Sequence, residues 1–517
     1  MSRSTLIKGT IMLTVASLLS KILGSIFRIP LQNIAGDEVL GIFSLVYPVY
    51  MVALILSVAG IPTAISKLIA EERALDPNAN IRPIYVTASI LALSFGVVSF
   101  TFIYVFSSPI AYALGGPTSR LSLILVATTL LIAPYMAVYR GFFQGFGDMG
   151  PTAISQVIEQ FIRVGLILVL AYVLVSRGLS NEKIAGYIMI GSVAGALASF
   201  LFLRVKFARS PLKPVSNSSY SFATFSRVGK KILKVSIPIA VGSITMALVN
   251  FIDSLTIPFG LRSIGVDGAS DIHYLYGIYG RGLALVQIAT VFATSIVLPL
   301  IPLLTEKLVN HDRNGMRTTI EKAFYMANLI AWPAAFGLLA LTLPMNVGLF
   351  SDLEGSTMLA IIGFSSVFTS LTVLGTGILQ GMNLANQAAY IILIGIVVKT
   401  FSNIFLVHLF GLNGAAISTL VVYIFLFIVN MIFIYRNIPF SFWHGWKIVK
   451  MIVASLSMAI IIGAPTLFFQ VAEWSRLQAV LYVMGAILVG AVIYFGMLFV
   501  WNVIDRENVK KHVQKGG

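Results

Sequence analysis

Long apolar runs, separated by short polar segments, dominate the sequence from end to end. Each run can cross the hydrocarbon core of a bilayer as a helix, which needs about 20 residues. The runs lie near residues 10–34, 40–70, 84–107, 121–145, 152–176, 184–204, 232–260, 277–305, 322–350, 357–381, 388–409, 414–435, 448–470 and 477–502. Backbone polar groups in lipid must bond within their own segment, so the runs predict helices and not strands. We therefore expect an all-α membrane protein with about fourteen transmembrane helices.

Composition supports this class and excludes several others. The chain is 58% hydrophobic and 10% charged, whereas a soluble domain carries about 25% charged residues. It has no cysteine, which excludes disulfides, thiolate metal sites and a cysteine nucleophile. Its five histidines show no metal-binding spacing. We expect neither a metal nor a cofactor, and we interpret the first apolar run, which continues through Ile34, as a retained helix.

The basic residues predict the orientation of these helices. With the N-terminus in the cytoplasm, 25 lysines and arginines fall on the cytoplasmic side. The opposite side holds only Arg28, Arg120, Arg177, Lys183, Arg262 and Arg476. This asymmetry predicts a protein of the bacterial cytoplasmic (inner) membrane with both termini cytoplasmic. It also accounts for the net charge of +16 through a surface facing membrane lipids, so we expect no nucleic-acid partner.

An internal repeat with an offset of 236 residues relates the two halves of the chain. It places Gly41-Ile42 on Gly277-Ile278, Gln144-Gly145 on Gln380-Gly381, and Arg163 on Lys399. Chance similarity between apolar segments is the alternative explanation. Six helices per repeat predict two parallel lobes around a central cavity, where transporters place their substrate site. The expected divisions are an N-terminal six-helix lobe (1–207), a cytoplasmic basic linker (208–231), a C-terminal six-helix lobe (232–437), and helices 13 and 14 with a basic tail (438–517).

Charged side chains inside the predicted spans form the candidate site, since each costs several kcal/mol unless it faces a partner or a wet cavity. The candidate substrate-binding residues are Lys21, Arg28, Arg163, Arg281 and Lys399. The supporting polar residues are Glu159, Asp253, Gln156, Asn250 and Asn403. Helical spacing gathers them into stripes that face the protein interior. An interior with more cations than anions favours an anionic substrate, and phosphate in particular.

Structural roles for these charges remain as alternatives. Glu159 and Arg163 are spaced i, i+4 and could neutralise each other as an ion pair. Asp253 could be the partner of Arg281 or of Arg28. Arg281 could instead extend toward the membrane surface from the end of its helix.

Two motifs carry a resemblance to a known family. The texts LIKGTIMLTVASLLSKILGSIFRIPLQNIAG and GIPTAISKLIAEE resemble the multidrug/oligosaccharidyl-lipid/polysaccharide flippase superfamily, and within it the polysaccharide biosynthesis and stage V sporulation protein B-like branch. That branch is similar to the lipid II flippases. The resemblance implies a two-lobed transporter that works by alternating access, holds a lipid pyrophosphate in a cationic cavity, and uses helices 13 and 14 to form a groove for the polyprenyl tail.

The same resemblance assigns roles to single residues. Ser20-Lys21-Ile22-Leu23-Gly24 matches the S-R-x-L-G motif of lipid II flippases, with lysine in place of arginine. Arg281 matches the arginine of their eighth span. Arg28 lies one residue beyond the second family arginine, and the arginine pair of the second span is replaced by Tyr50-Met51-Val52.

These observations predict a flippase and not an enzyme. The expected substrate is an anionic polyprenyl-pyrophosphate-linked saccharide, lipid II-like or another cell-envelope precursor, moved from the cytoplasmic to the outer leaflet. Enzymes of cell-envelope synthesis are candidate partners. The alternative is a cation-coupled multidrug exporter of the same fold, which would need an acid inside the first span or an acid-rich pocket for cationic drugs. A membrane enzyme would need a large external loop with paired carboxylates, and we interpret Asp352 and Glu354 as solvated loop ends.

Overall fold

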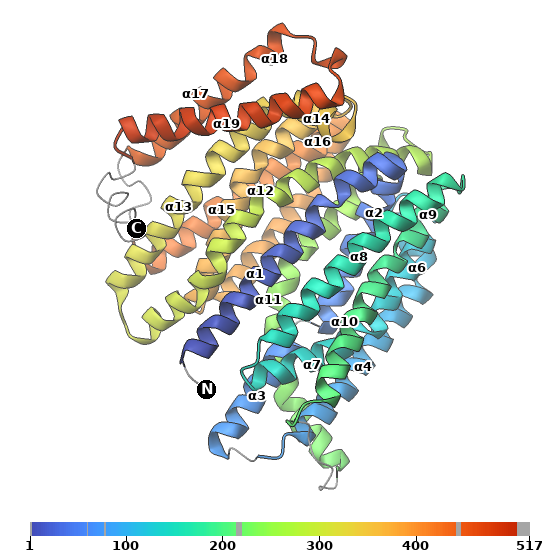
Figure 1. Ribbon diagram of the computed structural model, residues 1–517, viewed down its shortest axis with the longest axis vertical. Helices are drawn as coiled ribbons and strands as arrows, with labels where there is room; N and C mark the ends of the chain where they lie inside the picture. Colours follow the sequence, from blue (N-terminus) through green and yellow to red (C-terminus); the bar gives the residue numbers. More distant parts are fainter. Residues whose placement is uncertain (1–2, 59, 77–78, 213–219, 441–445, 504–517) are drawn as a thin grey trace. The chain divides into compact units, whose positions relative to one another are not determined.

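The structure is a computed structural model that describes residues 3–58, 60–76, 79–212, 220–440 and 446–503 (Figure 1). Across these ranges the chain forms helices and no strand, as expected for an all-α membrane protein. It divides into two compact units, residues 1–280 and 281–517. These two units are defined by contacts between residues and not by the sequence repeat. The lobe boundaries expected from the repeat therefore stay a prediction. Part of the expected linker (213–219) and the basic tail from residue 504 lie outside the described residues.

The N-terminal unit contains the helices up to the start of α12. Their bounds are α1 (Arg3–Ile26), α2 (Arg28–Val58), α3 (Ile61–Leu75), α4 (Arg82–Val105), α5 (Ser107–Ala113), η1 (Pro117–Ser119), α6 (Arg120–Ala127), η2 (Thr128–Leu131), α7 (Ala133–Gly145), α8 (Gly150–Ser176), α9 (Asn181–Ile188), α10 (Ile190–Ala208), α11 (Phe222–Ser263) and α12 (Ala269–Val309). Several of them (α3, α4, α7 and α8) begin with proline in the first turn, where its missing N–H costs no hydrogen bond.

The C-terminal unit contains the rest of α12 and the helices that follow. They are α13 (Arg313–Ala340), α14 (Thr342–Phe350), α15 (Ser356–Gly381), α16 (Ala385–Asn437), α17 (Lys447–Gly463), α18 (Pro465–Phe468), η3 (Val471–Glu473) and α19 (Arg476–Val500). The last two long helices, α17 and α19, lie side by side (Figure 1). They correspond to the expected helices 13 and 14.

The number of spans agrees with the sequence. Eleven described segments are long and apolar enough to cross a membrane. Two of them each contain two spans, because Met12–Leu75 is interrupted at Gly36 (φ 81°) and Ala385–Asn437 at Gly411 (φ 55°). Glycine occupies both interruptions because it adopts positive φ at little cost. With α11 counted as one more span, these segments make the fourteen expected.

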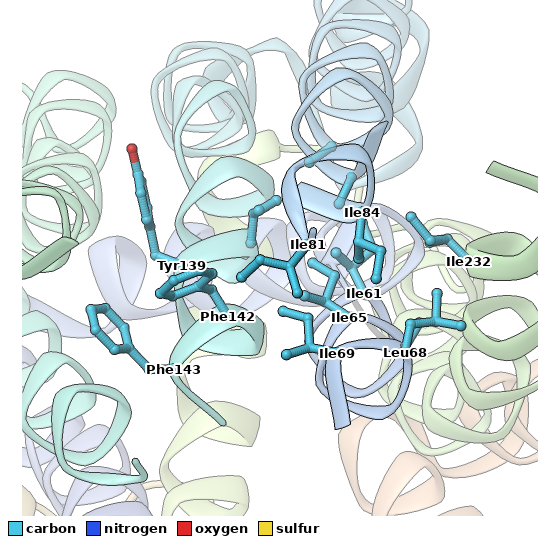
Figure 2. Packing of buried hydrophobic residues seen from close by; sticks show 14 of the residues in the cluster. Ile61, Ile65, Leu68, Ile69, Ile81, Ile84, Tyr139, Phe142, Phe143 and Ile232 are labelled. Atoms are coloured by element: carbon cyan, nitrogen blue, oxygen red, sulfur yellow. The ribbon is translucent and has the colours of Figure 1, made fainter. Parts of the chain in front are cut away.

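Close helix pairs repeat along the chain at the expected offset. In the N-terminal unit a side chain at Gly141 or Gly145 of α7 would collide with Pro62 or Ile69 of α3, and apolar residues of both helices pack around this contact (Figure 2). In the C-terminal unit the offset positions Gly377 and Gly381 of α15 lie equally close to α12. Small residues four apart allow membrane helices to approach closely.

A second close approach joins the glycines that the repeat relates to each other. A Cβ atom on Gly41 of α2 would lie 1.8 Å from the carbonyl oxygen of His273, and one on Gly277 of α12 would lie 1.9 Å from that of Asp37. Residue 37 is related to residue 273 by the same offset of 236. The contact is therefore made twice, by equivalent positions, which supports a true repeat over chance similarity.

Candidate functional site

Arg163 of α8 connects three helices of the N-terminal unit. Its Nη1 donates a hydrogen bond of 3.2 Å to the hydroxyl of Tyr47 on α2, and its guanidinium lies 5.8 Å from the centre of that ring. On its other side is Gly24 of α1, where a Cβ atom would come within 3.5 Å of Nη2. A Cβ atom there would meet Nε2 of Gln160 at 2.6 Å, so the glycine of the Ser20–Gly24 motif makes room for the Gln160 side chain, with Arg163 in ordinary contact beside it.

Arg28, the first residue of α2, is buried without a polar partner. Its side chain is 6% exposed, and its Nε makes no hydrogen bond with any described residue. The guanidinium lies 5.9 Å from the ring of Phe43, which stacks on Tyr47 at 5.3 Å. Arg28 and Arg163 therefore each lie beside one ring of the same stacked aromatic pair.

Lys21 belongs to the same region but is exposed. It lies one turn before Gly24 on α1, and the hydroxyl of the preceding Ser20 contacts the carbonyl oxygen of Gln156 on α8 at 3.4 Å. The amide groups of Gln156 and Gln160 include buried atoms, Oε1 and Nε2 respectively, with no hydrogen-bond partner. We name Lys21, Arg28 and Arg163 the N-terminal cation cluster; none of the three forms an ion pair with a described residue.

The interpretation of Glu159 and Arg163 as an ion pair is wrong in this structure. Glu159 accepts a bond of 2.7 Å from Nη2 of Arg140 on α7 instead. Arg140 also donates to the hydroxyls of Ser155 on α8 (3.0 Å) and Ser199 on α10 (3.1 Å). Glu159 is thus bonded to Arg140, and Arg163 forms no ion pair with a described residue.

Two further supporting residues lie on α11. Asp253 is buried and accepts a hydrogen bond of 3.1 Å from the hydroxyl of Tyr279 on α12. The carbonyl oxygen of Asn250 accepts one from Ser254 within the same helix. Pairing of Asp253 with Arg281 or Arg28 stays a prediction.

In the C-terminal unit, Arg281 forms an ion pair with Asp352, an acid that the sequence suggests is a solvated loop end. Its guanidinium is fully buried and forms two bonds, of 2.7 and 2.8 Å, with the carboxylate of Asp352. Nη1 also donates to Asn346 on α14. Asp352 is thus not simply a solvated loop end, although its side chain is 37% exposed. Arg281 also does not extend to the membrane surface, because its side chain has no exposed area.

Lys399 is equally buried, between the two halves of α16. Its Nζ donates a hydrogen bond of 2.5 Å to the hydroxyl of Thr419, and Asn403 lies fully buried one turn further along. Since α16 turns back at Gly411, Lys399 faces the helix that follows its own.

The structure therefore places two of the five predicted cations, Arg28 and Arg163, beside one aromatic pair in the N-terminal unit, and Lys21 lies on the adjacent helix α1. Arg281 and Lys399 occupy separate buried environments in the C-terminal unit. Sequence reasoning missed Tyr47, Arg140 and Asp352 because their partners are distant in sequence and no periodic pattern connects them. No group of histidine, aspartate and glutamate able to hold a metal occurs in the part of the chain that the structure describes.

Known proteins show clear similarity to this sequence. The family described as polysaccharide biosynthesis protein matches residues 6–308. The uncharacterized membrane protein YabM of Bacillus subtilis (strain 168) is 31% identical over 413 residues, which cover 80% of this chain and 76% of the relative. The lipid II flippase MurJ of the same organism is 26% identical over 95% of this chain and 94% of its own length. Its stage V sporulation protein B is 24% identical, over 99% and 98%.

Solved structures show the same fold. A lipid II flippase MurJ in an inward closed conformation matches 95% of this chain and all of that chain, with a TM-score of 0.68 and 16% identity. An inward-facing multidrug resistance transporter of the MATE family matches 84% of this chain and 99% of that chain, with a TM-score of 0.60 and 18% identity. Taken with the family match, which spans more than half of the sequence, these findings show that this multi-pass membrane protein belongs to the polysaccharide biosynthesis protein family, on the stage V sporulation protein B-like branch of the multidrug/oligosaccharidyl-lipid/polysaccharide flippase superfamily.

Proposed function

We propose that this protein is a flippase that moves a polyprenyl-pyrophosphate-linked saccharide from the cytoplasmic to the outer leaflet of the bacterial cytoplasmic membrane by alternating access. The N-terminal cation cluster carries the proposal. A buried arginine without a carboxylate partner is costly, and Arg28 has this cost. Arg163 is half-buried and also forms no ion pair with a described residue. A phosphate group would offset it, because its oxygens accept charge-assisted hydrogen bonds from guanidinium groups.

The cluster offers different chemistry at different depths. Lys21 is exposed and can make the first contact with an arriving anion, whereas Arg28 is buried and can bind only after the surrounding side chains move. Tyr47 holds one edge of the Arg163 guanidinium, so its remaining N–H groups are oriented before the substrate arrives. The membrane potential assists outward movement, since it contributes about 2.3 kcal/mol per charge per 100 mV.

The C-terminal cations have supporting roles in this proposal. In the structure Asp352 already satisfies Arg281, and the side chain of Lys399 has no exposed area. We therefore assign pyrophosphate binding first to the N-terminal cation cluster. A cavity shared by both lobes remains part of the proposal.

The test is flipping of a fluorescent lipid-linked saccharide by purified protein in liposomes. Arg28→Ala and Arg163→Ala should each lower the apparent substrate affinity by about tenfold or more, because a hydrogen bond to a charged group contributes about 1.5–3 kcal/mol. Arg177→Ala, which removes an exposed arginine after α8, is the matched control and should flip normally. Normal flipping by both Arg28→Ala and Arg163→Ala would refute the assignment.

The relatives suggest which saccharides to examine first. One is named a lipid II flippase and another a sporulation protein, so lipid II, a spore-cortex precursor and other cell-envelope units are the candidates. Rescue of a cell depleted of its essential lipid II flippase would identify lipid II as a substrate.

The alternative function, cation-coupled multidrug export, predicts attraction of cationic drugs. Structural similarity to MATE transporters concerns the fold alone. The N-terminal cation cluster would repel a cationic drug. Export of such drugs by liposomes that contain the protein, without flipping of any lipid-linked saccharide, would favour this alternative.

A further inference from the structure

Four basic residues form a stripe along the first turns of α11. Arg227, Lys230, Lys231 and Lys234 are spaced by three, one and three residues, so they share one face of the helix. All four side chains are exposed. We name them the basic stripe.

The opposite face of these turns is packed against the N-terminal unit. Val228 and Ile232 are buried in the apolar cluster formed with α3, α4 and α7, and Figure 2 shows Ile232 beside it. This packing fixes the rotation of the helix and directs the basic stripe away from the protein. Phe222, at the start of α11, is 83% exposed.

The length of α11 places the basic stripe at the membrane surface. The helix has 42 residues and is therefore about 63 Å long, whereas the hydrocarbon core is about 30 Å thick. Asp253 is the only charged residue between Lys234 and Arg262. The apolar part of α11 thus begins where the basic stripe ends, which leaves Arg227, Lys230 and Lys234 at the depth of the lipid headgroups.

The segment of sequence that contains the basic stripe has no acidic residue. Residues 183–252 contain nine lysines and arginines and no aspartate or glutamate. Glu72 of α3 lies 4.0 Å from Lys231, but Arg227, Lys230 and Lys234 form no ion pair with the residues described. The basic residues around the α12–α13 junction differ, since Lys307 pairs with Asp312 and Arg317 with Glu321.

The lack of acidic partners for most of the basic stripe distinguishes a lipid-binding site from basic residues that only set the membrane orientation. Acidic residues contribute little to the rule that sets membrane orientation, so orientation does not require their absence. Attraction to a negatively charged leaflet depends on net charge, and each basic residue near the surface contributes about 1 kcal/mol.

We propose that the basic stripe binds the phosphate groups of anionic phospholipids in the adjacent leaflet. Arg227, Lys230 and Lys234 supply the charge. This site is separate from the N-terminal cation cluster and does not depend on the proposed flippase activity.

The experiment measures binding of short-chain phosphatidylglycerol to the purified full-length protein in a neutral detergent. The readout is the rise in the thermal unfolding midpoint as the lipid is added. Phosphatidylcholine and inorganic phosphate are tested as parallel ligands. The triple variant Arg227→Gln/Lys230→Gln/Lys234→Gln keeps Lys231 and its contact with Glu72. We expect it to bind phosphatidylglycerol about a hundredfold more weakly, which follows from about 1 kcal/mol per charge.

The matched control removes the same charge from the C-terminal unit, as Arg313→Gln/Arg317→Gln/Lys322→Gln, and should bind phosphatidylglycerol like the unmodified protein. Arg227→Lys, which keeps the charge, should also bind normally. Should the triple variant unfold, Arg227→Gln alone should weaken binding by about fivefold. Equal loss in the control triple, equal binding of phosphatidylcholine, or equal stabilisation by inorganic phosphate would each overturn the proposal.

Discussion

At the residue scale, Arg163 shows which contacts a sequence can and cannot predict. The i, i+4 spacing correctly places Glu159 and Arg163 on one stripe of α8, because helical geometry is local. It does not predict their partners, because Arg140 lies 19 residues before Glu159 and Tyr47 lies 116 residues before Arg163. Helix packing decides which of two nearby arginines the carboxylate reaches. The types of side chain in the site were therefore predictable, whereas their pairing was not.

This pairing gives a prediction for Arg140. In Arg140→Gln, Glu159 loses its ion-pair partner and can turn toward Arg163 on the next turn of α8. We expect the apparent affinity for substrate in the flipping assay to fall by about tenfold, since the anion must then compete with a carboxylate.

The second substitution in the pair provides the control. Glu159→Gln added to Arg140→Gln removes the competing charge and should restore substrate affinity. If the double variant remains as weak as Arg140→Gln, Arg140 acts on the site in some way other than by holding Glu159.

At the element scale, the length of the apolar runs predicted most of the spans. The runs near 10–34 and 40–70 are separated at Gly36, and those near 388–409 and 414–435 at Gly411. Sequence reasoning did not predict that α1 ends at Ile26 and α2 begins at Arg28 within one apolar run. Hydropathy does not register such a break, because Phe27 is as apolar as its neighbours.

The crossing of α2 and α12 gives a stability prediction. A side chain in Gly41→Leu would overlap the backbone of His273, which a flexible side chain cannot relieve. We expect a loss of about 3 kcal/mol, at the upper end of the usual cost of overpacking, measured as a fall in the thermal midpoint. Gly485→Ala on α19, where no atom lies within 4 Å, should leave the midpoint unchanged or raise it.

The start of α13 gives a pH prediction. The Asp312 carboxylate accepts the N–H of Gly315 (2.8 Å), and this bond, with help from Lys307, holds the pKa of Asp312 below its usual value of 3.8. Its stabilising contribution is therefore complete above about pH 4 and is lost as the pH falls through the lowered pKa. The thermal midpoint of Asp312→Ala should lie below that of the unmodified protein at pH 7, and the difference should shrink below pH 4. A constant difference between pH 7 and pH 3 would contradict this role.

At the scale of the whole molecule, the repeat was visible in the sequence because its glycines are structural. Gly41 and Gly277, and the pairs in α7 and α15, keep their spacing because a side chain at any of them would collide with a neighbouring helix. The cations of the two halves are not equivalent in the same way. Arg163 and Lys399 are related by the offset, but one contacts a tyrosine ring and the other a threonine hydroxyl.

The proposed orientation can be tested directly, because the chain has no cysteine and any introduced thiol is unique. Arg177→Cys should react with a membrane-impermeant maleimide added to intact cells. Lys230→Cys should react only after the cells are permeabilised. The reverse pattern would invert the proposed topology.

The turn at Gly411 has a practical consequence for studies of this protein in cells. Since the chain reverses direction between two spans at a single residue, the connection between them is very short. An epitope tag inserted at this point would have to separate two packed membrane helices. A protease added outside the cell would have no loop there to cleave. This end of the hairpin should stay hidden from antibodies even where its neighbours can be labelled.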